Sequence, residues 1–230
     1  MADTERIRIA IDGPAAAGKS TVAKRLAKKL SFTYIDTGAM YRALTLRCLE
    51  EDIALTDEEA VYRLLLETSI ELKQMDDTQK VLLNGKDVTD TIRSQEVSRQ
   101  VSLIARFPKV RAEMLRRQQA MAKEGNIIMD GRDIGTNVLP DAEVKFYLIA
   151  SVDERAKRRF EENERKGIPS DFAQLKSEIA ERDRRDMERK HGPLRKAEDA
   201  IAIDTTKLTI EEVLAEMLAH VNKVRKFRED

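Results

Sequence analysis

The sequence predicts an α/β fold in three layers, with helices on both faces of a parallel sheet. Short segments rich in β-branched residues alternate with longer segments in which apolar residues recur every three or four positions. Each short segment is apolar almost throughout, which is typical of strands covered on both faces. Five segments fit this description and predict a five-stranded sheet: 7–11, 32–35, 126–130, 144–149 and 200–204.

Helices are indicated between and after these strands. Behind the first strand, Val22, Leu26 and Leu30 recur every four residues, so one helical face can pack on the sheet. Later helix starts are indicated where Ser or Thr is followed three residues on by Glu, as in a capping box. These starts are at Thr56, Ser151 and Thr209.

Two segments depart from the alternation of strand and helix. Residues 70–90 alternate with a period of two around Asn84-Gly85, a strong indication of a β-hairpin turn. We expect a small β insertion there. Residues 155–196 are dense in charge and contain few large aliphatic residues, so we expect helices that are mostly solvated and form a mobile lid.

Composition excludes several classes of protein. The 42 basic and 42 acidic residues cancel, so no overall field favours a nucleic-acid or membrane partner. Cys48 is the only cysteine, which excludes a disulfide framework and favours a reducing compartment. No apolar run approaches the roughly 20 residues of a membrane span, and no secretion signal is evident. We expect a soluble, cytoplasmic monomer.

Residues 13–20 match the phosphate-binding pattern GxxxxGK[ST], between a predicted strand and a predicted helix. Such a loop points backbone N–H groups inward, and the following helix adds its positive N-terminus. Lys19 would reach the β- and γ-phosphates of ATP, and Ser20 could bind Mg²⁺. The pattern predicts a P-loop NTPase-like fold. The predicted ATP-binding residues are Gly13, Pro14, Ala15, Ala16, Ala17, Gly18, Lys19, Ser20 and Thr21.

A P-loop alone leaves the phosphate acceptor open, because switches, ATPases and small-molecule kinases share it. A regulatory GTPase would also carry an Asn-Lys-x-Asp guanine reader. The nearest sequence, at 222–225, is Asn-Lys-Val-Arg and lacks the acid. The switch hypothesis is therefore weaker than a kinase.

Arginines follow two of the predicted strands. Arg42 lies in a helix after the second strand, and Arg132 follows the strand at 126–130. Ligands of open α/β sheets bind at this carboxyl edge, and a guanidinium fork suits a phosphate. The alternative for Arg42 is an arginine on a solvated helix face, and the alternative for Arg132 is a charged surface turn.

A further stripe runs along the predicted lid helix. Leu175, Ile179, Arg182, Asp186 and Arg189 are spaced to share one helical face. A ladder of ion pairs within the helix would be worth only about 0.3–0.5 kcal/mol per pair. It would not explain why the charges continue an apolar seam. The stripe predicts a helix that docks at its apolar end and directs its charges into a cleft.

Together these motifs resemble the bacterial cytidylate kinases, of the nucleoside monophosphate kinase group. The resemblance covers almost the whole chain and implies transfer of the γ-phosphoryl group of ATP to CMP, and to dCMP, with Mg²⁺. It also accounts for the β insertion, which bacterial members carry in the monophosphate-binding region. It rests on residues 11–21, 36–42, 107–111, 130–136, 196–200 and 204–206.

The resemblance implies one kinase domain with three parts. The core would comprise about residues 1–36, 108–150 and 197–230. The monophosphate-binding region with the β insertion would be about 37–107, and the lid about 151–196.

The resemblance also implies residue roles. Thr37, Arg42 and Arg132 would hold the monophosphate, while Ser102, Arg111 and Asp133 would read cytosine. Asp133 would accept from the exocyclic amine, whereas uracil presents a carbonyl that would face the acid unpaired. Arg182 and Asp186 would contact the ribose, and Arg189 a phosphate. The implied catalytic residues are Lys19, Arg132, Arg182 and Arg189, with Ser20 and Asp130 at the Mg²⁺.

Two alternatives remain open from sequence. One is a kinase for another small anionic acceptor such as UMP, AMP or a non-nucleotide acid. The other is an RNA-associated P-loop module that uses the segment 155–196. That segment interleaves acidic residues and offers only Phe160 and Phe172 as stacking platforms, which disfavours RNA binding.

Overall fold

The computed structural model describes residues 6–75, 78–123 and 125–229. A five-stranded parallel sheet has the strand order β2-β6-β1-β7-β8. The bounds of each strand lie within one residue of the prediction, so the predicted P-loop NTPase-like α/β fold is confirmed. The strands are β1 (Arg8–Asp12), β2 (Thr33–Asp36), β6 (Ile127–Gly131), β7 (Val144–Ile149) and β8 (Ile201–Asp204).

Helices cover the sheet because side chains alternate between its faces. Ile9 and Ile11 of β1 pack with Leu26 of α1 (Lys19–Leu30) and Met217 of α8 (Ile210–Glu229). On the other face, Ala10 joins a separate cluster with buried residues of β2, β6 and the π-helical turn Ile134–Val138. The carboxyl ends of the strands stay free of both clusters.

The β insertion is present, with one more strand than the Asn84-Gly85 turn alone predicted. β4 (Thr78–Leu83) and β5 (Lys86–Asp87) form the predicted hairpin, with positive φ values of 47° and 83° at Asn84 and Gly85. β3 (Ile70–Met75) pairs antiparallel with the other edge of β4. The connection between β3 and β4 runs through residues 76–77, outside the described part of the chain.

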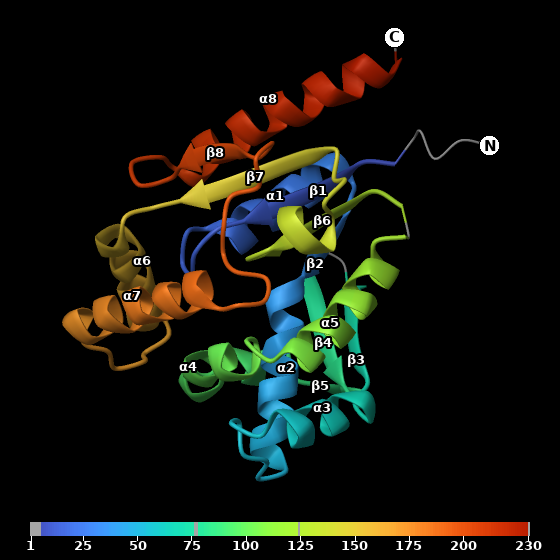
Figure 1. Cartoon of the computed structure of the whole chain (residues 1–230). Coiled ribbons are helices and arrows are strands. Elements are labelled where there is room, and N and C mark those ends of the chain that lie inside the picture. The colour runs from blue at the N-terminus through green and yellow to red at the C-terminus, as the bar shows by residue number, and fades with distance from the viewer. Residues whose placement is uncertain (1–5, 76–77, 124, 230) are drawn as a thin grey trace.

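The insertion and four helices build a second hydrophobic core beside the main sheet (Figure 1). Met40, Leu44, Leu65, Val81 and Met114 are all buried in it. Gln79 joins this region to the edge of the main sheet, because its side-chain amide accepts from Asp36 N and donates to Tyr34 O. The helices are α2 (Thr37–Glu50), α3 (Glu58–Leu66), α4 (Gln95–Ile104) and α5 (Pro108–Met121), with a short 3₁₀ turn at Thr91–Arg93.

The charge-dense segment forms two helices, α6 (Val152–Arg165) and α7 (Phe172–Glu188), at one end of the sheet (Figure 1). The predicted caps at Ser151 and Thr209 are confirmed. The predicted cap at Thr56 is wrong by one residue, because Asp57 accepts from the Ala60 amide at 3.1 Å. The described helices include none that is apolar over enough length to cross a membrane.

Two adjacent leucines of α3 test the second core. Leu65 is 0% exposed and Leu66 is 53% exposed. We predict that Leu65→Ala lowers the free energy of unfolding by about 2–5 kcal/mol, because it leaves a cavity. Leu66→Ala, the matched control, should change it by less than about 0.5 kcal/mol. Equal urea-unfolding midpoints for the two variants would contradict the buried position of Leu65.

Candidate active site

The loop between β1 and α1 contains three residues with positive φ. Gly13 has a φ of 146°, and a Cβ there would overlap the carbonyl oxygen of Leu148 on β7. Ala16 and Gly18 also have positive φ values, of 60° and 88°. Gly18 is the N-cap of α1 and brings no side-chain cap, so the first amides of the helix remain available to an anion.

Lys19 begins α1 and is 5% exposed. Its Nζ donates to the carbonyl oxygen of Pro14 at 2.6 Å, so the ammonium group is held over the loop. Burial, together with the charge of Arg132, lowers the pKa of Lys19, although Asp130 acts in the opposite direction. A phosphate beside Nζ would favour the charged form of the side chain.

Asp130, near the end of β6, joins two elements. Its Oδ2 accepts from Ser20 Oγ and its Oδ1 from the Tyr34 hydroxyl, both at 2.7 Å. Burial and the charge of Asp36 raise the pKa of Asp130. A hydroxyl and a buried carboxylate are hard oxygen ligands of the kind that Mg²⁺ prefers, so these residues fit the expected cation.

Asp36 ends β2 and orients Arg42. Its carboxylate accepts from the Ala39 amide at 2.9 Å, which caps α2. The same carboxylate pairs with Arg42 at 2.8 Å and with Arg93 at 3.4 Å. Burial alone would raise the pKa of Asp36, but Arg42 and Arg93 outweigh it and lower the pKa. Thr37, the next residue, donates through Oγ1 to Asp130 O at 2.7 Å.

Asp186 of α7 gathers arginines from two directions. Its Oδ2 accepts from Arg132 Nε at 3.0 Å, and its Oδ1 lies 3.7 Å from Arg189 Nη1. Arg132, Arg182 and Arg189 thereby lower the pKa of Asp186, although burial acts in the opposite direction. Burial and the charge of Arg132 lower the pKa of Arg182 to about 10. The helical spacing would also allow an ion pair between Arg182 and Asp186. In the structure, Asp186 instead pairs with Arg132, which belongs to another element.

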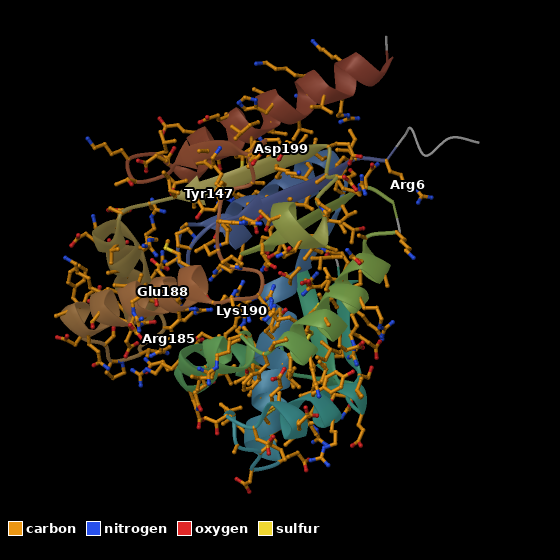
Figure 2. The ribbon with its side chains drawn as sticks, viewed as in Figure 1. Arg6, Tyr147, Arg185, Glu188, Lys190 and Asp199 are labelled. Carbon is orange, nitrogen blue, oxygen red and sulfur yellow. The ribbon has the colours of Figure 1, made fainter. Side chains whose placement is uncertain are left out.

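The predicted position of Arg189 on the lid helix is wrong. α7 ends at Glu188, and Arg189 is its C-cap with extended backbone (φ −62°, ψ 138°). Figure 2 shows Glu188 and Lys190, which flank it, where the chain leaves α7. Arg189 nevertheless reaches the site because its Nη2 donates to Asp133 Oδ1 at 3.3 Å.

Asp133 and Arg111 form a partly buried ion pair beneath the segment that follows α7. Asp133 Oδ2 accepts from Arg111 Nη2 and from Asn137 Nδ2. Gly192 covers this pair, and a Cβ at Gly192 would overlap both Arg111 Nη2 and Asp133 Oδ2. Ser102 lies half-buried on α4 at the same cavity.

A cavity of about 180 Å³ brings these groups together. It extends from the phosphate-binding loop to the Arg111–Asp133 pair, so a donor and an acceptor could meet within it. Every residue predicted for substrate binding, catalysis or metal binding lines it: Lys19, Ser20, Thr37, Arg42, Ser102, Arg111, Asp130, Arg132, Asp133, Arg182, Asp186 and Arg189. Whether they bind nucleotides stays a prediction.

Of the predicted ATP-binding residues, only four line this cavity: Ala15, Ala16, Lys19 and Ser20. The other five belong to the back of the loop or to the helix that follows it: Gly13, Pro14, Ala17, Gly18 and Thr21. Gly13, Ala17, Gly18 and Thr21 can act through their backbone N–H groups, as in other phosphate-binding loops. Pro14 has no N–H group, and its carbonyl oxygen accepts from Lys19 Nζ.

Sequence reasoning missed further residues of the cavity. Arg93 and Arg159 line it. Arg93 lies in the 3₁₀ turn Thr91–Arg93, which does not follow a strand of the main sheet. Arg159 belongs to α6, where its charge was indistinguishable from its solvated neighbours. Asp12 is not part of the cavity lining, and it was also missed because it looked like the polar end of a strand. It is 4% exposed, and burial raises its pKa to about 6.

Comparison with known proteins assigns the family. The cytidylate kinase family model matches residues 9–223. A cytidylate kinase of Geobacillus sp. (strain WCH70) is 62% identical over 217 residues, which is 94% of this chain and 97% of that protein. A cytidylate kinase of Bacillus subtilis (strain 168) is 57% identical over 219 residues, which is 95% of this chain and 98% of that protein.

A solved structure shows the same fold at low identity. The crystal structure of an uncharacterized protein from Eubacterium ventriosum ATCC 27560 has a TM-score of 0.53 and 14% identity, covering 95% of this chain and 99% of that chain. The high identity over nearly the full length of the Geobacillus and Bacillus proteins goes further than the fold. This chain belongs to the cytidylate kinase family.

Proposed function

We propose that this chain transfers the γ-phosphoryl group of ATP to CMP, and to dCMP, giving ADP and the cytidine diphosphate. The observation that carries the proposal is the single cavity that connects the phosphate-binding loop with an arginine cluster and the Arg111–Asp133 pair. The names of the relatives favour cytidine over the UMP, AMP and non-nucleotide acceptors left open by sequence.

On the donor side, the loop amides and Lys19 hold the phosphates of ATP. The positive φ values at Gly13, Ala16 and Gly18 support this role, because turns that contain residues with positive φ form anion-binding concavities of backbone N–H groups. Within the described residues, the hydrogen bond of Lys19 Nζ goes to a neutral carbonyl, so phosphate oxygens can replace Pro14 O.

On the acceptor side, arginines neutralise the CMP phosphate. Arg42 and Arg182 each have a buried Nε without a hydrogen-bond partner among the described residues. Buried unpaired donors are costly, and an oxyanion within the cavity would satisfy them. Arg132 pairs with Asp186 through Nε and with Gly131 O through Nη1, which leaves its Nη2 for phosphate. Arg189 already contacts Asp133, Asp186 and the Gly192 carbonyl, so a phosphate would replace one of these contacts.

Base selection rests on Asp133, Arg111 and Ser102. The ion pair fixes the Asp133 carboxylate at the cavity wall, where it can accept from the exocyclic amine of cytosine. UMP would bring a carbonyl to the same acid and leave two acceptors opposed. Asp186 takes a ribose hydroxyl in this arrangement, and Thr37 lies on the phosphate side.

Ser20 and Asp130 would hold Mg²⁺, with Asp130 acting through the water shell of the ion. When bound, this cation offsets negative charge on the phosphates that meet in the cavity. The Ser20–Asp130 contact at 2.7 Å supports the assignment, because one hydroxyl and one carboxylate already converge there.

The chemistry of the transfer depends on position and charge. The attacking oxygen of CMP is already anionic, so no general base is needed. Lys19, Arg132, Arg182 and Arg189 stabilise the charge that spreads over the transferred group. Closure of α6 and α7 would exclude water, which otherwise competes as acceptor.

We further propose that the protein acts as a cytoplasmic monomer, without a nucleic-acid partner. One chain supplies every residue of the cavity, so the proposed site needs no second copy. The single buried cysteine suits a reducing compartment.

Removing the ammonium group of Lys19 tests the donor side. Lys19→Met should lower kcat for CMP phosphorylation about 10²–10³-fold, because a charged donor to the transferring phosphates is lost. A coupled assay of ADP release measures this. Lys29→Met, in the exposed last turn of the same helix, is the matched control and should retain wild-type turnover. Undiminished turnover in Lys19→Met would sink the proposed role.

Removing the carboxylate of Asp133 tests base selection. Asp133→Ala should lower the ratio of kcat/KM for CMP to that for UMP about tenfold or more, because the acceptor for the amine is gone. Asp141→Ala, in the exposed turn before β7, is the control. If the ratio stayed at the wild-type value, Asp133 would have no part in reading the base.

A further inference from the structure

Asp133 occupies a position where its side chain would ordinarily serve the backbone. It is the N-cap of the π-helical turn Ile134–Val138. An Asp at an N-cap usually folds back and accepts from the first free amides of its own turn. Here Asp133 makes no such cap, and its oxygens instead face Arg111, Arg189 and Asn137.

Asp12 accepts hydrogen bonds from the backbone amides that the Asp133 side chain does not cap. Its Oδ1 accepts from Ile134 N at 2.8 Å and its Oδ2 from Gly135 N at 2.7 Å. Asp12 comes from the end of β1, more than a hundred residues away in sequence, and lies beside Gly131 in the sheet register. Both oxygens of one carboxylate therefore cap a turn that belongs to another element.

We infer that Asp12 is a positioning residue for base selection, because it caps the turn in place of Asp133 and so keeps the Asp133 carboxylate directed into the cavity. This inference rests on the proposed function, in which Asp133 reads cytosine. Asp12 itself does not line the cavity, so its effect on the substrate passes through Asp133.

Competition between two carboxylates is the physical basis. Ile134 and Gly135 are buried, and buried amides require a partner. If Asp12 no longer accepts from both, the nearest alternative within the same turn is Asp133, one and two residues before them. A fold-back of Asp133 would satisfy the amides and withdraw the carboxylate from Arg111 and from cytosine.

Asp12→Asn and Asp12→Ala test the inference. Asn keeps one acceptor but opposes an NH₂ group to the second amide, and Ala keeps none. The ratio of kcat/KM for CMP to that for UMP should fall about tenfold in Asp12→Ala and less in Asp12→Asn. KM for CMP should rise more than KM for ATP. A ratio at the wild-type value in both variants would overturn the inference.

The ratio of kcat/KM for CMP to that for UMP separates a positioning role of Asp12 from a role in stability or in the charge near Lys19. Partial unfolding lowers the active fraction equally for CMP and UMP and cancels in the ratio. Loss of the Asp12 charge near Lys19 would likewise slow both reactions alike. Asp57→Asn, which changes an exposed carboxylate that caps its own helix, is the matched control and should leave the ratio unchanged.

A double variant and a measurement on the unmodified protein complete the test. In an Asp133→Asn background, Asp12→Asn should not lower the CMP-to-UMP ratio of kcat/KM any further, because both changes act through the Asp133 carboxylate. A full additive loss would overturn the inference. Hydrogen exchange by NMR should show strong protection at the Ile134 and Gly135 amides of the wild-type protein. Rapid exchange there would overturn it even if no Asp12 variant folds.

Failure of the inference is distinguishable from failure of the proposed function. If the wild-type protein showed no preference for CMP, or if Asp133→Ala kept that preference, the proposed base reading would fail. If both behaved as proposed while the Asp12 variants kept the wild-type ratio, only the inference about Asp12 would fail.

Discussion

The site depends on the need of buried carboxylates for partners. Three strands of the parallel sheet end in or near a buried aspartate: Asp12 in β1, Asp36 in β2 and Asp130 in β6. Burying an unpaired charge is costly, so each side chain must bind donors from elsewhere. Asp36 binds arginines, Asp130 binds hydroxyls, and Asp12 binds backbone amides. The pairing that removes this cost also aligns the groups around the cavity.

Much of the fold and the phosphate-binding loop could be predicted because both depend on local pattern. Continuous apolar segments identified all five strands, and the edge rule for parallel sheets then predicted that Arg42 and Arg132 lie together. The β insertion was predicted over residues 70–90, but the pairing of β3 with β4 within it was not, because Asn84-Gly85 was the only turn signal used. The cap of α3 shifted by one residue because Asp57 is an equally good cap and lies nearer to the helix.

The rest of the site could not be predicted because its contacts join residues that are distant in sequence. The face of α7 was predicted from its period, yet the partner of Asp186 is Arg132, 54 residues away. Arg189 was placed on a helix that ends one residue earlier. Arg93 and Asp12 have no sequence pattern of their own, and their roles follow only from the neighbours that the fold gives them.

The contact made by Gln79 has a consequence for how this molecule meets its copies. β2 is an edge strand, and such edges offer free N–H and C=O groups that can recruit a strand from another chain. Gln79 binds the Asp36 amide and the Tyr34 carbonyl, as the backbone of an adjacent strand would. One side chain thereby occupies two of the edge groups of β2 beside the candidate active site, where a strand of a second copy would otherwise pair.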